Sequence, residues 1–457
     1  MKTRTLSVAL ALLLSSLASL SSAHEQEPSD LKAQAEAQLA ASSAPEQAQQ
    51  PRRFTPCVRG MAGEFPCHRV DLLSFFPMEE IGGGTAVGTG RGNDVWGWTD
   101  PQTRRDYVLA GRENGTAIVD ITDPKRPVYL ANLPTAAPPG DADRIWRDIK
   151  VHADHAFVVA EGGPPSFQHG MQVLDLTRLR DIDPADAPVT LSEDTLYKEF
   201  ETAHNVAINE DTGFAYALGA RNADRSLSCE GGLHMVDISD PTNPTFAGCW
   251  SDDGYIHDTQ CVVYEGPDAD HRGREICINS NSQTGPQGGL RRVTITDVTD
   301  KSSPVSLAAV PYEGSAFSHQ GWLTEDQSHF LFGDEGDELS FGHPTRTLVW
   351  DVSDLTAPAV IGTFFSSADA TDHNMYVKNR YVYQSNYRAG LRVLDLRNVE
   401  QGTLEEVAFF DVYPPNDDPG FGFGTWSNYP FFKRGVVAVH GYQGLWLLKP
   451  RLGERQP

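Results

Sequence analysis

One short pattern recurs seven times along this chain. In each copy an aspartate, histidine or asparagine opens an apolar strand, a turn follows, and a second apolar strand returns. The clearest copy is AHNVAINEDTGFAYALG, and the full set opens at Asp94, Asp148, His204, His257, His319, His373 and Asn428. Successive copies begin 53–62 residues apart. A nearly constant period of this size predicts a chain built from structural repeats.

Each repeat continues with two further strands. A loop leads to an apolar strand that ends in aspartate, as in AIVDITDP, HMVDISDP and LVWDVSDL, and a proline precedes the fourth strand. Turn residues of this kind, between short strands rich in Val, Ile, Leu, Phe and Tyr, are typical of antiparallel sheets. Seven units of four strands predict an all-β fold, a seven-bladed β-propeller of four-stranded antiparallel blades.

The two ends of the repeat region are expected to close this ring. The last repeat ends at LWLLKP without a fourth strand, whereas RVDLLSFFP, before the first repeat, resembles the other fourth strands. An open propeller would expose two sheet edges. We therefore expect residues 70–76 to complete the seventh blade.

The beginning of the chain has the pattern of a targeting segment. Residues 1–23 combine Lys2 and Arg4 with an apolar core and small residues up to Ala23, which predicts a signal peptide. Residues 24–53 are rich in Ala, Gln, Glu and Pro and are expected to be a disordered linker. Residues 54–452 then form a single propeller domain. No anchor is visible and no other apolar stretch approaches ~20 residues, so we expect an exported protein, periplasmic or extracellular, without membrane insertion.

Six cysteines suit an oxidising compartment and fall into three local pairs. We expect the first pair to staple the segment before the first repeat. Cys229 and Cys249 are placed on the third and fourth strands of one blade. Cys261 and Cys277 are placed on the first and second strands of the next blade. The expected disulfides are Cys57–Cys67, Cys229–Cys249 and Cys261–Cys277.

The formal net charge of −25 argues against nucleic acid as a partner, because phosphate binding requires a basic surface. It disfavours anionic membrane surfaces for the same reason. The acidity fits a soluble monomer, and an unknown protein, glycan or small ligand on the loop faces is the expected partner.

Three long stretches resemble a known family. They are CVRGMAGEFPCHRVDLLSFF, NDVWGWTDPQTRRDYVLAGRENGTAIVDITDP and GGLHMVDISDPTNPTFAGCWSDDGYIHDTQCV, and they are similar to the choice-of-anchor B family. The resemblance covers about residues 57–450. It implies an exported bacterial β-propeller made of LVIVD repeats, whose molecular role is not established. Members of that family end in varied anchors, and this chain departs from them by showing none.

The opening residues are the most chemically informative set. If the repeats superpose, they form a ring at one end of the central channel, and imidazole with carboxylate suits a transition metal such as Zn, Cu, Fe or Mn. The metal-binding candidates are His204, His257, His319, His373, Asp94 and Asp148. The alternative is that these side chains line a water-filled tunnel and only join neighbouring blades by hydrogen bonds.

The turns after the second strands should reach the same end of the channel. With two tryptophans they would make a polar, aromatic-edged funnel, which is a usual place for a ligand. The funnel candidates are Arg112, Glu161, Arg221, Asn281, Asp334, Glu335, Asn386, His440, Trp96 and Trp426. An ordinary hydrated loop face is the alternative.

Other motifs point to less. The acidic stretches 334–338 and 266–275 offer oxygen ligands for Ca²⁺, although neither has the EF-hand spacing. The chain has no G-x-S-x-G elbow, P-loop or Rossmann glycine run, so no nucleotide cofactor is expected and the catalytic residues are unknown.

Two functions follow from these patterns. The first is an exported binding or interaction module with a His- and Asp-lined channel. The second is a metalloenzyme, a hydrolase or an oxidoreductase, that holds its metal with the channel histidines. Metal retained after purification would separate them.

Overall fold

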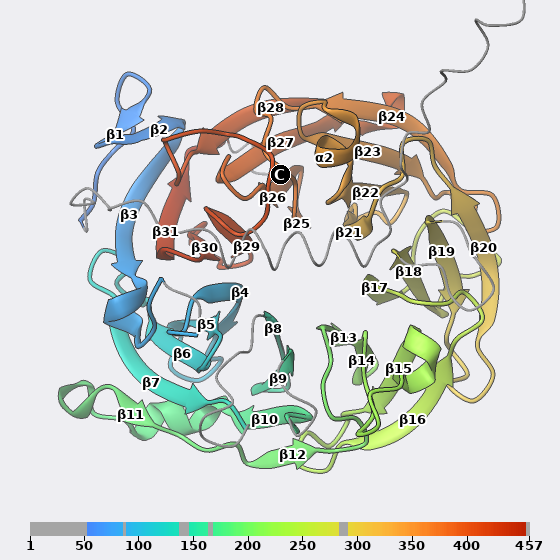
Figure 1. The fold of residues 1–457 in the computed structure, drawn as a ribbon, viewed down its shortest axis with the longest axis horizontal. Coiled ribbons are helices and arrows are strands. Elements are labelled where there is room, and N and C mark those ends of the chain that lie inside the picture. The colour runs from blue at the N-terminus through green and yellow to red at the C-terminus, as the bar shows by residue number, and fades with distance from the viewer. Residues whose placement is uncertain (1–52, 86–87, 137–145, 163–167, 283–290, 454–457) are drawn as a thin grey trace, which may run out of the picture.

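The computed structural model is a seven-bladed β-propeller, as predicted (Figure 1). It describes residues 53–453 except 86–87, 137–145, 163–167 and 283–290. The predicted signal peptide and almost all of the predicted linker therefore lie outside the described residues. Within the described part of the chain, no helix is both long and apolar enough to cross a membrane.

Each blade is an antiparallel sheet whose first strand faces the central channel and whose fourth strand forms the rim (Figure 1). Blades 1 and 2 are built from β4 (Gly92–Thr99), β5 (Asp106–Arg112), β6 (Gly115–Asp120), β7 (Val128–Pro134), β8 (Trp146–His152), β9 (His155–Glu161), β10 (Met171–Asp175) and β12 (Thr195–Tyr197). Blades 3 and 4 are built from β13 (Asn205–Asn209), β14 (Phe214–Leu218), β15 (Leu233–Asp237), β16 (Thr245–Trp250), β17 (Asp258–Val263), β18 (Glu275–Asn281), β19 (Arg292–Asp297) and β20 (Val305–Pro311).

The remaining blades follow the same plan, with small additions. Blades 5 to 7 are built from β21 (Ser318–Leu323), β22 (His329–Asp334), β23 (Arg346–Asp351), β24 (Ala359–Phe365), β25 (Asn374–Lys378), β26 (Tyr381–Ser385), β27 (Leu391–Asn398), β28 (Thr403–Phe410), β29 (Thr425–Tyr429), β30 (Val437–Gly441), β31 (Gly444–Pro450) and β3 (Val70–Pro77). Strand β11 (Val189–Thr190) extends blade 1, and β2 (Phe65–His68) with β1 (Met61–Ala62) extends blade 6. Helical segments are short: α2 (Asp337–Phe341), η1 (Met78–Ile81), η2 (Leu176–Asp181), η3 (Pro184–Asp186), η4 (Ser228–Gly231) and η5 (Val399–Gln401).

The repeat motif contains an aspartate that ends the third strand in blades 1 to 5 and lies near the end of the third strand in blade 6, and this aspartate forms a turn. Its carboxylate accepts a hydrogen bond of 2.8–3.0 Å from the backbone N–H two residues later, as in an Asx turn. The carboxylates belong to Asp120, Asp175, Asp237, Asp297, Asp351 and Asp395. The motif therefore encodes the turn that returns the chain to the rim.

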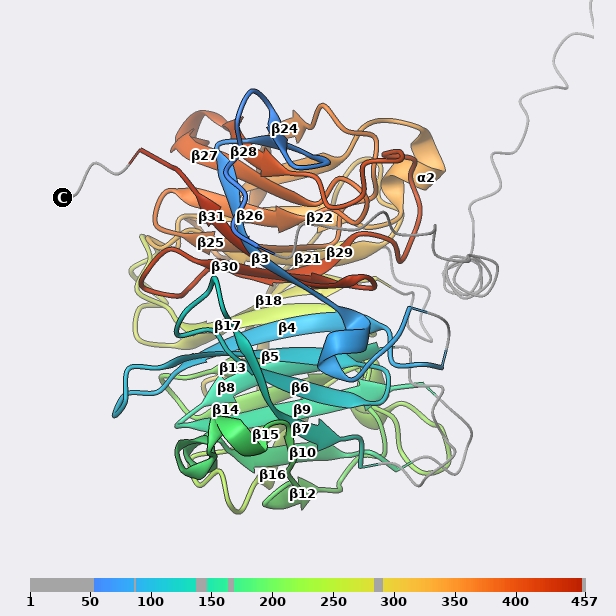
Figure 2. The same cartoon turned by 90° about the vertical axis from the view of Figure 1, so that its left-hand side faces the viewer.

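The ring is closed by strand β3, as expected. It pairs antiparallel with β31, from Val70 opposite Pro450 to Pro77 opposite Gly444. Figures 1 and 2 show the two strands side by side, blue against red. The ring of Phe75 packs on Trp446 with centroids 4.7 Å apart. The N-terminal strand is thus part of the last blade's core.

All three predicted disulfides are formed: Cys57–Cys67, Cys229–Cys249 and Cys261–Cys277. The placement of Cys229 on a third strand was wrong. It lies in η4 before β15, where Cys229 and Glu230 both have positive φ values that do not fit a strand. Three disulfides are typical of proteins from oxidising compartments.

Candidate functional site

The residues that open the inner strands lie in two layers of the channel, and not in one ring as predicted. Asp94 Oδ2 accepts a hydrogen bond from the N–H of Ile149, just after Asp148. Asp148 Oδ2 likewise accepts from Val206, just after Asn205. Asp94 and Asp148 are therefore equivalent to Asn205, and His204 lies one residue earlier.

The first layer, which we name the histidine layer, contains His204, His257, His319 and His373. Their rings follow one another around the channel, with centroid separations of 4.6, 4.4 and 4.4 Å. Aromatic rings extend this series at both ends. Trp146 lies 5.7 Å from His204, and Trp426 lies 4.6 Å from His373, centroid to centroid.

The second layer, which we name the carboxylate layer, carries Asp94, Asp148 and Asp258 with the side-chain amides of Asn205, Gln320 and Asn374. Asn205, Asp258, Gln320 and Asn374 each follow a histidine of the first layer directly, so the two layers lie one residue apart along the chain and line the same cavity. Asn428 belongs to neither layer. Its amide donates to Tyr383 O and Ser385 Oγ of the adjacent blade, so its inclusion in the ring was wrong.

Hydrogen bonds to carbonyl groups fix the tautomer of three histidines. Nδ1 of His257 lies 3.1 Å from the carbonyl oxygen of His319, and Nδ1 of His319 lies 3.1 Å from that of His373. Nδ1 of His373 lies 2.6 Å from the carbonyl oxygen of Trp426. A carbonyl oxygen can only accept, so each Nδ1 carries the hydrogen and the Nε2 of each neutral ring keeps its lone pair.

His204 is oriented differently. Its Nδ1 lies 2.6 Å from Oε2 of Glu161, and the other oxygen of that carboxylate lies 3.7 Å from Nε of Arg221. Metal-binding histidines commonly donate the N–H of their second ring nitrogen to a carboxylate, because this hydrogen bond orients the ring and makes Nε2 a stronger metal ligand.

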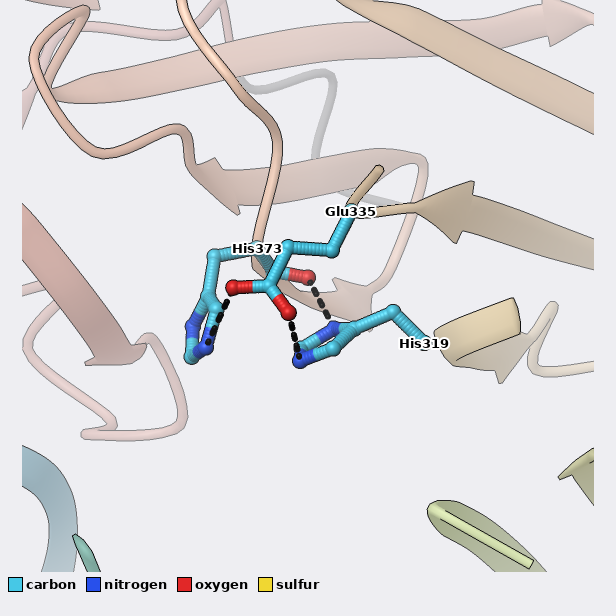
Figure 3. A group of neighbouring side chains, drawn as sticks. All are labelled: His319, Glu335 and His373. Atoms are coloured by element: carbon cyan, nitrogen blue, oxygen red, sulfur yellow. Dashed lines mark hydrogen bonds and ion pairs between the residues drawn. The ribbon is translucent and has the colours of Figure 1, made fainter. Parts of the chain in front are cut away.

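Glu335 brings a carboxylate to this layer from the loop after β22. Its Oε2 lies 3.5 Å from Nε2 of His319, and its Oε1 lies 3.7 Å from Nε2 of His373 (Figure 3). One atom from each of the three residues falls within 4.8 Å of the others. The hydroxyl of Tyr387 donates a 2.6 Å hydrogen bond to Oε1 and holds the carboxyl group in place.

Burial controls the protonation of these groups. It lowers the pKa of His257 and His319 well below the usual value, and that of His373 to about 3. It raises the pKa of Glu335 to about 8, although the hydrogen bond from Tyr387 opposes this. At neutral pH the imidazoles are thus neutral, which is the form that binds metal ions.

The histidine layer forms one wall of a cavity of about 360 Å³ in the channel. Below it, Lys150 Nζ lies 2.6 Å from Asp148 Oδ1, 3.8 Å from Asp94 Oδ2 and 4.6 Å from the centroid of the Trp96 ring. Polar and aliphatic side chains also line the cavity, together with a group of aromatic ones: Trp96, Trp322, Tyr376, Tyr429 and Phe431. The cavity can therefore surround a small organic molecule.

The protonation states of Asp94, Asp148 and Lys150 depend on one another. Burial raises the pKa of Asp94 well above its usual value. Burial would also raise the pKa of Asp148, but the ammonium of Lys150 and the hydrogen bond from Val206 lower it. The pKa of Lys150 is raised, because the carboxylates of Asp148 and Asp94 outweigh its burial. An ionised Asp148–Lys150 pair beside a protonated Asp94 is the expected state.

The predicted funnel residues separate into two groups. Glu161, Glu335 and Trp426 contact the histidine layer, Arg221 approaches Glu161, and Trp96 lies deeper in the cavity. The others take part in bonds that hold the blades. The guanidinium of Arg112 donates hydrogen bonds to the carbonyl oxygen of Gly82 and to Asn132 Oδ1, and the amide of Asn281 donates to the carbonyl oxygen of Asp253. The carboxylate of Asp334 accepts a hydrogen bond from the hydroxyl of Tyr312. Both ring nitrogens of His440 lie within hydrogen-bond distance of carbonyl oxygens. The backbone N–H of Asn386 donates a hydrogen bond to the carbonyl oxygen of Gly390 in a turn.

Lys150, Trp322 and Tyr376 were not identified from the sequence. Each lies two residues after a member of the carboxylate layer, at Asp148, Gln320 and Asn374 respectively. The alternation of strand side chains was the signal that could have located them.

Known proteins offer a limited comparison. The LVIVD repeat family model matches residues 229–252, and no curated protein matches the chain. Solved structures align with this chain at low identity and with TM-scores below 0.5. A protein from Lactobacillus plantarum is 15% identical, with a TM-score of 0.45 over 77% of this chain and 88% of that one. The periplasmic gluconolactonase of Pseudomonas aeruginosa is 13% identical, with a TM-score of 0.45 over 69% of this chain and 87% of that one. A functionally unknown protein from Desulfotomaculum acetoxidans is 13% identical, with a TM-score of 0.47 over 77% of this chain and 89% of that one.

Proposed function

We propose that this protein is a metalloprotein that binds one transition-metal ion at the histidine layer. The ligands are Nε2 of His319, Nε2 of His373 and the carboxylate of Glu335, with His257 next to them. The observation that carries the proposal is that two Nε2 lone pairs face the two oxygens of one carboxylate, at 3.5 and 3.7 Å.

This arrangement requires a cation or a proton between the groups. Lone pairs and carboxylate oxygens are all acceptors, and Nδ1 of both rings already holds its hydrogen against a carbonyl group. A metal ion would replace the proton of Glu335 and satisfy all three groups at once.

Two imidazoles and one carboxylate leave coordination positions free for water or substrate. Zinc hydrolases and non-haem iron oxygenases both use such a ligand set. His257, His319 and His373 also line the channel cavity, so a molecule held there would lie beside the metal. We therefore infer a metal-dependent reaction on a small molecule, with the element deciding between hydrolysis and redox chemistry.

The test is elemental analysis and metal titration of the full-length protein, purified without chelators. We expect about one equivalent of metal per chain. Glu335→Gln and the double variant His319→Ala/His373→Ala should each lose more than the ~10–100-fold in affinity that removal of an outer-shell partner costs. His155→Ala is the control, because this histidine belongs to a hairpin and does not line the cavity. Unchanged metal content in the folded double variant would refute the proposal.

A second candidate is a binding module that needs no metal. The aromatic wall around Lys150 and Asp148 favours it, because such a cavity can hold a small ligand by stacking and charge. Ligand binding that is equally tight in metal-stripped protein would support this candidate over the metalloenzyme.

We also propose that the chain is an exported member of the choice-of-anchor B family. The LVIVD match at residues 229–252 and the three disulfides support this assignment. Expression of the full chain with mass spectrometry of the exported product would test it, and we expect cleavage after Ala23.

A further inference from the structure

The channel cavity has two chemically different sides. Its tryptophan, tyrosine and phenylalanine rings come from blades 1, 5, 6 and 7, whereas Lys150, Glu210 and Asp258 come from blades 2 to 4. Each of these sets of blades is contiguous in the ring (Figure 1). A molecule in the cavity would therefore have aromatic rings on one side and charged groups on the other.

The aromatic side is a packed array of rings. The ring of Tyr376 meets those of Trp96 and Trp322 edge to face, with centroids 5.6 and 5.0 Å apart. Trp96 meets Tyr429 in the same way at 5.1 Å. Such contacts fix the orientation of the rings. The array therefore offers a preformed surface for an apolar group, and the negative potential of a ring face also attracts cations.

Acidic side chains outnumber basic ones around this cavity. Asp94, Asp148, Glu210 and Asp258 line it, and Lys150 is the single lysine or arginine among the described lining residues. The ammonium of Lys150 is already held by Asp148 and Asp94, at 2.6 and 3.8 Å. An anionic ligand would therefore meet no cationic side chain that is free to bind it.

Lys150 shows how this cavity holds an ammonium group. Its Nζ lies 4.6 Å from the centroid of the Trp96 ring and 2.6 Å from Asp148 Oδ1, so that an aromatic face and a carboxylate act on it together. A ligand with an ammonium group can be held by the same two kinds of contact.

Two further carboxyl groups are available for such a ligand. Asp258 accepts a hydrogen bond of 2.7 Å from the backbone N–H of Thr259. Within the described part of the chain, neither Asp258 nor Glu210 forms an ion pair. Glu210 is exposed, in the turn between β13 and β14, so the cavity reaches the surface there. An acid at the mouth of a cavity attracts cations toward it.

We propose that the channel cavity binds a small organic cation, an amine that carries an aromatic or other apolar group. The ammonium group lies toward Asp258, and the apolar group lies against the rings of Trp96, Trp322 and Tyr376. A volume of about 360 Å³ suits one such molecule. The inference rests on the proposed function only in making this amine the substrate, because binding by the rings and the carboxyl group needs no metal.

The test compares three probes that share a phenyl ring and differ in charge: 2-phenylethylamine, 2-phenylethanol and phenylacetate. Tryptophan fluorescence of the full-length, chelator-stripped protein would report binding, because Trp96 and Trp322 line the cavity. The measurements are made at pH 8, above the pKa of about 7 that burial gives Asp258, so that its carboxyl group is ionised. We expect the amine to bind at least ~10-fold more tightly than the alcohol, and phenylacetate to bind most weakly.

Variants assign the two kinds of contact. Asp258→Asn should lose the preference for the amine and keep its affinity for the alcohol, because only the charged contact is removed. Trp322→Leu should weaken the binding of both. Asp252→Asn alters an exposed acid that does not line the cavity, and should bind all three probes as the parent does.

Three results with the parent protein would overturn the proposal: equal affinities for the three probes, tightest binding of phenylacetate, or no binding of any probe up to ~10 mM. These decide the case even if a variant does not fold. An unchanged preference for the amine in folded Asp258→Asn would overturn it as well. Elemental analysis of the same protein keeps the two proposals apart. Amine selectivity without metal uptake would refute the metal centre alone, and metal uptake without amine selectivity would refute the organic-cation site alone.

Discussion

At the scale of single residues, burial sets the charge of the channel wall. Asp258 follows His257 and lines the cavity. Burial, reinforced by the charge of Asp148, raises its pKa to about 7. The ordinary pKa of an aspartate is ~3.9, so the fold favours the neutral form. The resulting stability is complete below ~3.9 and is lost as the pH rises through about 7.

Asp258→Asn removes this ionisation and tests its effect. We expect the variant to have a higher Tm than the parent at pH 8 and no such advantage at pH 4, because only at pH 8 does the parent hold an ionised Asp258. Paired thermal melts of chelator-treated protein would measure the difference. Asp252→Asn, at an exposed position, is the control. A difference that stays constant from pH 4 to pH 8 would contradict the assigned pKa.

At the scale of the strand, the repeat predicted the blades, the closing strand and the disulfide pairs. It did not predict the register of the inner strands. Register shifts occur near the start of β4, β21 and β29, at Gly92/Val95, Ser318/Gln320 and Thr425/Ser427. Bulges of this kind redirect side chains, and the letters of one sequence do not reveal them. The shift in β4 accounts for the one-residue error in aligning Asp94 with the histidines, whereas Asp148, in a strand that pairs without a shift, was misaligned by one residue for lack of any register signal.

The closing strand offers a matched pair of phenylalanines. Phe75 in β3 is 2% exposed and packs on Trp446, whereas Phe246 in β16, also a fourth strand, is 51% exposed. We expect Phe75→Ala to lower the free energy of unfolding by about 3–5 kcal/mol, through lost burial and a cavity. Phe246→Ala should change it by no more than ~0.5 kcal/mol. Denaturant unfolding of both variants would test this, and equal effects would mean that β3 lies outside the cooperative core.

At the scale of the whole molecule, the blades are similar but their contributions to the channel differ. Blades 3 to 6 supply the histidines, and blades 1 and 2 supply Asp94, Asp148 and Lys150. The sequence located the four histidines and the two aspartates because they recur at the repeat period, but it did not locate Lys150. Glu335 was predicted as a funnel residue and as part of the acidic stretch 334–338, but not as a partner of the histidines, because its meeting with His319 and His373 depends on how one loop folds across two blades.

The proposed metal centre should depend on pH. Glu335 must ionise to bind the transition metal, and burial, reinforced by the charge of Asp334, raises its pKa to about 8. We therefore expect zinc binding to tighten as the pH rises toward about 8, because the metal then has less often to displace a proton. Competition with a chromophoric chelator would measure the affinity, and a value that stays constant between pH 6 and pH 8 would contradict this role of Glu335.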